Sequence, residues 1–282
     1  MSNWLTIGAS VSGLGHLQTR TPCQDAHYIK KLSKKWDIAV VSDGAGSCSN
    51  SHKGSSYTVK EFPQILSEML AEDNWFIEGI MPSSEEWRAR AFQSLTVLKQ
   101  HLFEYAKTIN CEYKSLSCTL IAILYSNKGA VSVHIGDGRA AVKLENGEWI
   151  SVMVPFKGEQ VGETVFLTSD YSFENPEMCI ETQVTQSPIE AFTIISDGLE
   201  RYFYQCYVID EEGLFSDPNQ SIEKIINKNV AAIQAMYDEN VKKKEISKRL
   251  RNYLKSGILA NEIDDKTMIL GYKKCGTVDK VS

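Results

Sequence analysis

The chain has 282 residues, of which 43% are hydrophobic and 23% are charged, and its formal net charge is −6. This length suffices for one large domain or two small ones with a sizeable core. The acidic balance argues against a nucleic-acid binder, which usually carries a basic face, and no apolar run reaches the roughly 18 residues that a membrane span needs.

The cysteines and the first ten residues indicate in which cellular compartment the protein is expected. None of the seven cysteines forms a C-x-x-C pair, so zinc-knuckle and thioredoxin-type motifs are absent from the sequence. The first ten residues lack the basic flank and apolar core of a signal peptide. Reduced thiols and a cytoplasmic location are therefore the simplest interpretation.

The N-terminal part is predicted to contain strands and then a helix. Apolar runs predict strands over residues 4–10, 26–32 and 36–42. One helical face follows, with the spacing i, i+3, i+4, i+7 and i+8: Phe62, Ile65, Leu66, Met69 and Leu70. Pro63 is expected near the start of this helix or at a kink in it. The preceding residues 47–55, which include His52 and Lys53, are expected to form a solvated loop.

A second helix and a long run of strands come next. Ser83 and Glu86 have the spacing of a capping box, and an apolar stripe continues from there to about Thr108. Strands are then expected over residues 118–126, 130–136, 139–145, 148–154, 163–169, 179–185 and 191–196. Asn146-Gly147 is the strongest hairpin signal among the turns between them.

The C-terminal part predicts two helices and a closing strand. Asp217-Pro218 resembles an N-cap followed by the first helical residue. Basic residues from Lys242 to Lys255 suggest the solvated side of a last helix, and the closing strand covers residues 266–272. Adjacent strands joined by tight turns are antiparallel, which predicts an α+β fold in layers. Composition shows no domain boundary, so we expect one domain over residues 1–274 and a short tail over residues 275–282.

Three of the predicted strands end on Asp-Gly. These Asp residues are Asp43, Asp137 and Asp197, and a fourth acidic site, Asp264 or Asp265, precedes the last strand. Asp-Gly alone is also an ordinary turn. The repeated pattern instead suggests carboxylates held at strand ends, where Gly permits a sharp turn and close approach of the backbone. Oxygen ligands of this kind suit Mg²⁺ or Mn²⁺, and converging carboxylates would need cations to offset their repulsion.

Six ordered motifs together resemble the metal-dependent serine/threonine protein phosphatases of type 2C, in particular their compact bacterial members. The motifs are "RTPCQDA" (20–26), "VVSDGAGS" (40–47), "LSCTLIAIL" (116–124), "HIGDGRAAV" (134–142), "IISDGLERY" (194–202) and "DDKTMIL" (264–270). The resemblance implies a four-layer αββα sandwich, in which two antiparallel sheets are flanked by helices. It also implies a site for two Mn²⁺ or Mg²⁺ ions at one end of the sandwich.

The resemblance also implies roles for individual residues. Asp43 would bridge both ions, and the carbonyl of Gly44 would be a further ligand. Asp197 and Asp264 would complete the shell of the first ion, and Asp137 would help to bind a third, weaker one. The remaining two roles belong to the first motif: Arg20 would grip the substrate phosphate, and Asp25 would orient water on the metals. The catalytic set is thus Arg20, Asp43 and Asp197.

The expected activity is hydrolysis of phosphoserine and phosphothreonine in proteins by a metal-activated water, without a covalent intermediate. The expected partners are phosphorylated proteins, including a Ser/Thr kinase, and not nucleic acid or membrane; a monomer is expected. Gln24 stands where many relatives carry Glu. This change leaves open a catalytically weak binding or regulatory module, and a metal-dependent phosphatase of small metabolites is the third alternative. Residues 154–178 occupy the position of a variable flap in relatives.

Overall fold

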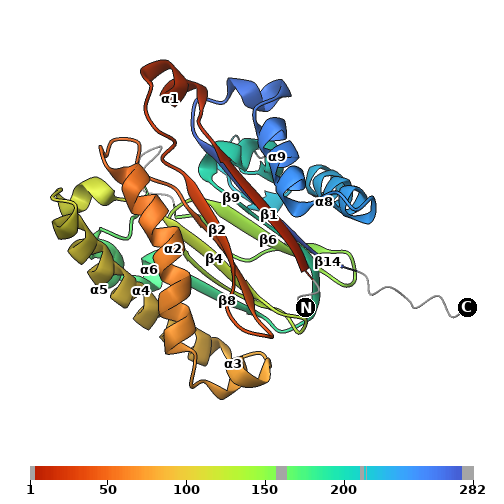
Figure 1. Ribbon diagram of the computed structural model, residues 1–282, viewed down its shortest axis with the longest axis horizontal. Coiled ribbons are helices and arrows are strands. Elements are labelled where there is room, and N and C mark those ends of the chain that lie inside the picture. Colours follow the sequence, from red (N-terminus) through yellow and green to blue (C-terminus); the bar gives the residue numbers. More distant parts are fainter. Residues whose placement is uncertain (1–3, 157–163, 210–212, 214, 275–282) are drawn as a thin grey trace, which may run out of the picture.

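In the computed structural model, two stacked antiparallel sheets are covered on their outer faces by helices (Figure 1). The structure describes residues 4–156, 164–209, 213 and 215–274. The predicted tail over residues 275–282 lies outside them. Among the described residues, no helix is long and apolar enough to cross a bilayer.

The first sheet joins the two ends of the chain. Its strand order is β1-β14-β9-β6-β7, and every pairing is antiparallel. The strands are β1 (Trp4–Val11), β14 (Lys266–Lys273), β9 (Ile189–Ile195), β6 (Arg139–Leu144) and β7 (Trp149–Ser151). β1 pairs with β14 along its whole length, so the first and the last described strands of the chain are neighbours in this sheet.

The second sheet has the order β2-β3-β4-β5-β8, again antiparallel throughout. Its strands are β2 (Ala26–Lys31), β3 (Asp37–Ser42), β4 (Leu120–Tyr125), β5 (Ala130–Ile135) and β8 (Glu181–Thr185). The consecutive strands β5 and β6 belong to different sheets, so the chain crosses between the layers at residues 136–138.

Three apolar clusters hold the layers together. The cluster between the sheets includes Trp4, Tyr125 and Phe192, whose rings contact one another. The outer face of the second sheet packs against α2 (Ser51–Met69) and α4 (Ser84–Thr108), and the outer face of the first sheet packs against α8 (Glu223–Asp238) and α9 (Lys243–Leu254). The predicted four-layer αββα fold is thus confirmed, as is the capping box of Ser83 and Glu86.

The start of α2 differs from the prediction. The helix begins at Ser51, so Pro63 lies well inside it and residues 51–55, with His52 and Lys53, form its first turns rather than a solvated loop. Gly54 makes this possible, because a Cβ at that position would lie 2.0 Å from the carbonyl oxygen of Leu116. The helix therefore sits directly against η1 (Tyr113–Leu116).

Two further predictions are wrong. The described part of the expected strand 163–169 is irregular: Leu167 donates its N–H to Cys118 across 2.9 Å, and α5 (Asp170–Glu174) and α6 (Pro176–Cys179) follow. The helix expected at Asp217-Pro218 begins only at Glu223; the Asp217 carboxylate binds Arg139 and accepts the N–H of Asn219 at 2.9 Å within an irregular segment. Residues 157–163 of the expected flap lie outside the described part.

The alternating apolar pattern did not reveal the short elements. These are α1 (Leu14–Thr19), α3 (Asn74–Glu78), η2 (Asp197–Leu199), α7 (Glu200–Phe203), β10 (Tyr204–Gln205), β11 (Val208–Ile209), β12 (Phe215–Ser216), β13 (Gln220–Ser221) and η3 (Gly257–Asn261).

Candidate functional site

The predicted carboxylates lie where strands of both sheets end. Asp43 directly follows β3, Asp137 lies in the crossing between β5 and β6, and Asp197 comes two residues after β9. Asp264 lies two residues before β14, and Asp25 directly precedes β2. Because the sheets are stacked and antiparallel, these ends share one edge of the sandwich, and each carboxylate is supported by a rigid strand.

Asp43 is fixed through its backbone. Its N–H donates to the Thr119 hydroxyl at 3.0 Å, and its carbonyl accepts the Thr119 N–H at 2.8 Å. The next residue, Gly44, forms an isolated bridge with Cys118. A Cβ on Gly44 would lie 2.8 Å from the Gln24 carbonyl oxygen, so only glycine fits between the first motif and α2. The Asp43 carboxylate is thereby left to face the other strand ends.

Asp25 connects the two sheets. Its Oδ2 accepts the Ser196 hydroxyl at 2.7 Å, and the Ser196 oxygen in turn accepts the Thr267 N–H at 2.9 Å. Ser196 immediately precedes Asp197, and Thr267 lies in β14. One buried carboxylate therefore holds the end of β9 and the start of β14 against the start of β2.

The two adjacent aspartates before β14 have different surroundings. Asp265 is buried, and its oxygens accept the Gly13 N–H at 2.8 Å and the Gln24 N–H at 2.5 Å, while His16 Nδ1 lies 2.9 Å away. Asp264 is exposed, and among the described residues its carboxylate accepts a hydrogen bond only from the N–H of Asp265, at 2.8 Å. The Asp265 carboxylate thus binds the backbone at Gly13 and Gln24, whereas the Asp264 carboxylate is able to bind a metal ion.

The carboxylates act on one another electrostatically. Burial and the neighbouring Asp265 raise the pKa of Asp25 to about 8. Burial, Asp25 and Asp197 raise the pKa of Asp43 well above its usual range. Burial and Asp197 raise the pKa of Asp137 to about 7. Partial loss of hydration and the charge of Asp197 raise the pKa of Asp264 to about 6, although its side chain still reaches solvent. The structure therefore brings the predicted acidic residues together, and they disfavour each other's charge.

The donor set fits divalent cations. Asp25 Oδ1, Asp197 Oδ1 and Gln24 Oε1 are buried and have no hydrogen-bond partner within the described part of the chain. Among the described residues, no three His, Cys, Asp or Glu side chains already surround one ion-sized position. The charges of Asp25, Asp197 and Asp137 nevertheless act on Asp43 and raise its pKa, and a divalent cation would offset this repulsion between carboxylates.

Arg20 and Gln24 come from the loop between α1 and β2. Arg20 is exposed, with a left-handed backbone (φ 57°), and within the described residues its side chain makes no hydrogen bond or ion pair. The structure thus does not join it to the carboxylates, and its predicted contact with phosphate stays a prediction. Gln24 is buried and donates from Nε2 to the Cys48 carbonyl at 3.4 Å.

Sequence reasoning gave no role to Arg139, which directly supports the site. Its side chain is fully buried and binds Glu200 at 2.8 Å, Asp217 at 2.7 Å and Asn219 at 2.7 Å. Arg139 lies two residues after Asp137, and Glu200 lies three after Asp197. The guanidinium therefore ties together two of the acidic strand ends. The sequence does place this arginine at the start of an apolar strand. A charged side chain buried there needs buried partners, and this could have indicated its role.

Comparison with known proteins agrees with this geometry. A family model described as protein phosphatase 2C matches residues 12–255. Serine/threonine-protein phosphatase 3 of Escherichia coli (strain K12) is 26% identical over 203 residues, which are 71% of this chain and 75% of that protein. The family match includes the strands that carry Asp43, Asp137 and Asp197, and it ends before Asp264.

Solved structures show the same fold. The serine/threonine phosphatase of S. agalactiae has a TM-score of 0.58 at 15% identity, with 95% of this chain and 99% of that chain covered. RsbX in complex with magnesium has a TM-score of 0.50 at 16% identity, with 95% and 94% covered. At these identities the likeness establishes the arrangement of layers.

Proposed function

The chain belongs to the protein phosphatase 2C family, and on this premise we propose that it is a metal-dependent hydrolase that removes phosphate from phosphoserine and phosphothreonine in proteins. The E. coli relative, a serine/threonine-protein phosphatase, supports the substrate class. The observation that carries the proposal is the convergence of Asp25, Asp43, Asp137, Asp197 and Asp264 at one end of the sandwich, where burial and mutual repulsion raise the pKa of four of them.

Most of the acidic residues of the site would hold metal ions. Asp43, Asp197 and Asp264, with the carbonyl of Gly44, would hold two Mn²⁺ or Mg²⁺ ions, and Asp137 would hold a third, weaker one. When bound, such ions supply an acidified water for attack on phosphorus and positive charge for the phosphate oxygens. Magnesium is bound in one structure of the same fold, which supports the ion class; two ions and Mn²⁺ remain part of the proposal.

The chain's own side chains would orient the reaction. Asp25, held by Ser196 at 2.7 Å, keeps one buried oxygen free to accept a proton from a water at the site. Arg20 would bind the phosphate through its guanidinium, whose fork of N–H groups matches phosphate oxygens. Its exposed position would allow it to reach a substrate that arrives from solvent.

The wider expectations belong to the same proposal. Residues 1–274 would act as one catalytic domain, which the pairing of β1 with β14 supports. The enzyme would be a cytoplasmic monomer, and its substrates would include a phosphorylated Ser/Thr kinase. Of the alternatives, a weak binding module rests on Gln24 alone, and a metabolite phosphatase differs only in substrate.

Turnover measurements test these functions directly. The purified chain is given a phosphothreonine peptide, p-nitrophenyl phosphate or a sugar phosphate, with Mn²⁺, Mg²⁺ or EDTA. We expect metal-dependent release of phosphate from the peptide and from p-nitrophenyl phosphate, and its loss in Asp43→Asn, which removes a charge while keeping the shape. Absence of turnover in every condition would indicate the binding module, and preference for the sugar phosphate would indicate the metabolite phosphatase.

A further inference from the structure

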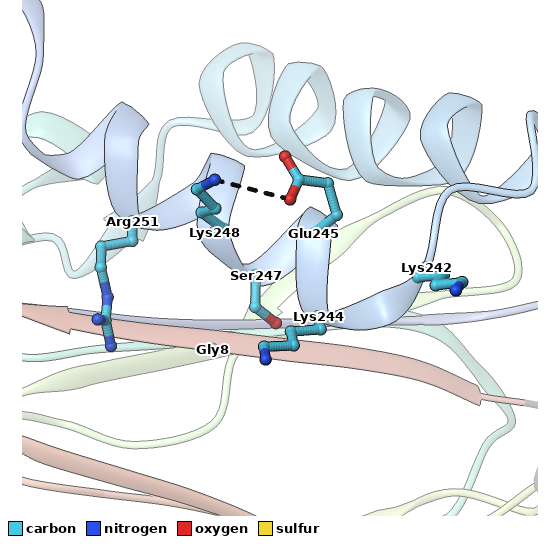
Figure 2. Close-up of a pocket in the computed structure, with 7 residues that line it drawn as sticks. All are labelled: Gly8, Lys242, Lys244, Glu245, Ser247, Lys248 and Arg251. Atoms are coloured by element: carbon cyan, nitrogen blue, oxygen red, sulfur yellow. Dashed lines mark ion pairs between the residues drawn. The ribbon is translucent and has the colours of Figure 1, made fainter.

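A basic groove lies between α9 and β1 (Figure 2), and its described lining includes none of the strand-end carboxylates. It has a volume of about 550 Å³ and is lined by Lys242, Lys244, Ser247, Lys248 and Arg251, with Gly8 of β1 on the other side. Within the described part of the chain, Glu245 is the only acidic residue in the lining. We call this feature the α9 groove.

The positive charge of the α9 groove is concentrated and largely unpaired. Residues 242–255 contain seven basic side chains and one acidic one, in a chain whose net charge is −6. Within the described part of the chain, Lys242, Lys244 and Arg251 form no ion pair, and Lys248 forms one long ion pair with Glu245, at 4.0 Å (Figure 2). The lining lysines and Arg251 are exposed, so their charges face solvent.

The stability of α9 does not explain this cluster. Lys242, Lys243 and Lys244 lie at the N-terminus of the helix, where the helix dipole disfavours positive charge. Lys244 and Lys248 are four residues apart on one face, where like charges repel. Ile246, Leu250 and Leu254 already anchor the opposite face in the core. The basic face thus costs the helix stability, which an anionic ligand would offset.

The shape and charge of the α9 groove favour an acidic peptide over other anionic ligands. A helix that lies on a membrane needs an apolar face to insert, and the apolar face of α9 is packed against β1. A nucleic acid would be repelled by the acidic remainder of the chain. An extended peptide with several Asp or Glu side chains would fit a groove whose Lys and Arg side chains lie along one helix.

The α9 groove lies close enough to the carboxylates for one substrate to reach both. Gly8, in the lining of the groove, lies three residues before the end of β1, and this length of strand is about 10 Å. Just beyond that end, Gly13 donates its N–H to Asp265, the neighbour of Asp264. His27, two residues after Asp25, packs so closely on Gly8 that a Cβ there would lie 2.5 Å from its ring. Roughly five extended residues would span the interval.

We propose that the α9 groove is a docking site for an acidic segment of the phosphoprotein substrate, so that phosphoserine or phosphothreonine residues a few positions from an Asp/Glu-rich stretch are preferred. This proposal rests on the proposed phosphatase function and adds a substrate class to it. The groove acts on substrate binding and has no part in the chemical step.

Charge reversal in the α9 groove tests the proposal. Lys244→Glu/Lys248→Glu is compared with Lys224→Glu/Lys228→Glu, which reverses two exposed lysines with the same spacing on the neighbouring helix α8, outside the groove. The substrates are two peptides with the same phosphothreonine, one flanked by five Asp or Glu residues and one by Gln and Ser, and p-nitrophenyl phosphate. Lys244→Gln/Lys248→Gln serves as a milder groove variant.

We expect the groove reversal to raise KM for the acidic peptide about five- to tenfold. The kcat for this peptide, the KM for the neutral peptide and the turnover of p-nitrophenyl phosphate should stay within about twofold of wild type. The Gln variant should show a smaller rise, and the α8 control should show none. Equal KM values for the two peptides in wild type, an unchanged KM in the groove variants, or an equal rise in the α8 control would overturn the proposal.

A binding measurement separates failure of this proposal from failure of the phosphatase function. Fluorescence anisotropy follows a labelled, unphosphorylated acidic peptide added to wild type and to the groove reversal, and needs no turnover. Binding that the reversal weakens would support the groove even if no phosphate substrate were hydrolysed. Peptide binding that is absent, while phosphatidylserine vesicles or an RNA oligonucleotide bind in its place, would overturn it.

Discussion

At the scale of single residues, the adjacent Asp264 and Asp265 are expected to differ in what their loss does. Asp264→Asn should weaken metal binding with little effect on folding, because among the described residues its carboxylate accepts a hydrogen bond from a single backbone N–H. Asp265→Ala should destabilise the fold by on the order of 1–3 kcal/mol for each of the N–H groups of Gly13 and Gln24 left without an acceptor. Mn²⁺ titration calorimetry and urea unfolding measure metal affinity and stability in both variants. Loss of metal binding in Asp265→Ala and loss of stability in Asp264→Asn would contradict this assignment.

Arg20 is the predicted site residue with the least support from contacts, so its test is kinetic. If its guanidinium binds the substrate phosphate, Arg20→Ala should raise KM for p-nitrophenyl phosphate about tenfold or more and leave Mn²⁺ binding unchanged. Arg88→Ala, which removes an exposed arginine on α4 paired with Glu177, is the control. A wild-type KM in Arg20→Ala would show that Arg20 does not bind the substrate phosphate.

At the scale of elements, Arg139 links β6 to the segments that follow β9. Removing one partner of a buried ion pair leaves the other charges uncompensated, so Arg139→Ala should cost about 3–5 kcal/mol of unfolding free energy. Arg139→Lys keeps the charge but loses the fork, and it should retain part of the stability. Urea denaturation gives both values; a cost below about 1 kcal/mol for the alanine variant would show that Glu200 and Asp217 need no such partner.

Most strands and the long helices could be predicted, because their apolar spacing matches the face that each one buries. The same spacing wrongly predicted a strand at residues 163–169. Val165 and Leu167 are buried there, but they belong to an irregular segment. Asp217 was misassigned because its carboxylate binds the distant Arg139 and accepts the N–H of Asn219 in an irregular segment, and no helix follows until Glu223. Pro63 is accommodated inside α2, whose face with Phe62 and Leu66 is buried in the core.

The acidic strand ends could be predicted from the repeated Asp-Gly pattern and the family resemblance. Their neighbours could not: Ser196, Thr267 and Arg139 acquire their roles only when segments tens of residues apart meet. The choice between Asp264 and Asp265 also needed the structure, since the sequence offers two adjacent carboxyls and only the fold shows which one binds Gly13 and Gln24.

At the scale of the whole molecule, the clustered carboxylates make stability depend on pH. The folded pKa values of Asp25, Asp137 and Asp264 are raised to about 8, 7 and 6, so the folded state holds these protons more tightly than the unfolded one. The resulting stability is complete below the unfolded pKa near 4 and is lost as the pH rises through the folded values. The metal-free protein should therefore melt at a lower temperature at pH 8.5 than at pH 5.5.

Thermal melts in EDTA and in Mn²⁺ at both pH values check this. We expect Tm in EDTA to fall by about 3 °C or more between pH 5.5 and pH 8.5, and the increase in Tm caused by Mn²⁺ to be larger at pH 8.5. Asp25→Asn should flatten the dependence in EDTA, because it removes the carboxyl whose pKa is raised furthest of these three. A metal-free Tm that rises over this range would contradict the electrostatic account.

The central claim is that strand ends distant in sequence form one centre for two divalent ions. The most direct measurement is the anomalous difference map of crystals soaked in Mn²⁺, recorded at the manganese absorption edge. The account predicts two strong peaks about 3.5–4 Å apart, one on each side of the Asp43 carboxylate, with Asp197 and Asp264 beside one of them. Peaks confined to other surfaces, or no peak within bonding distance of Asp43, would contradict it.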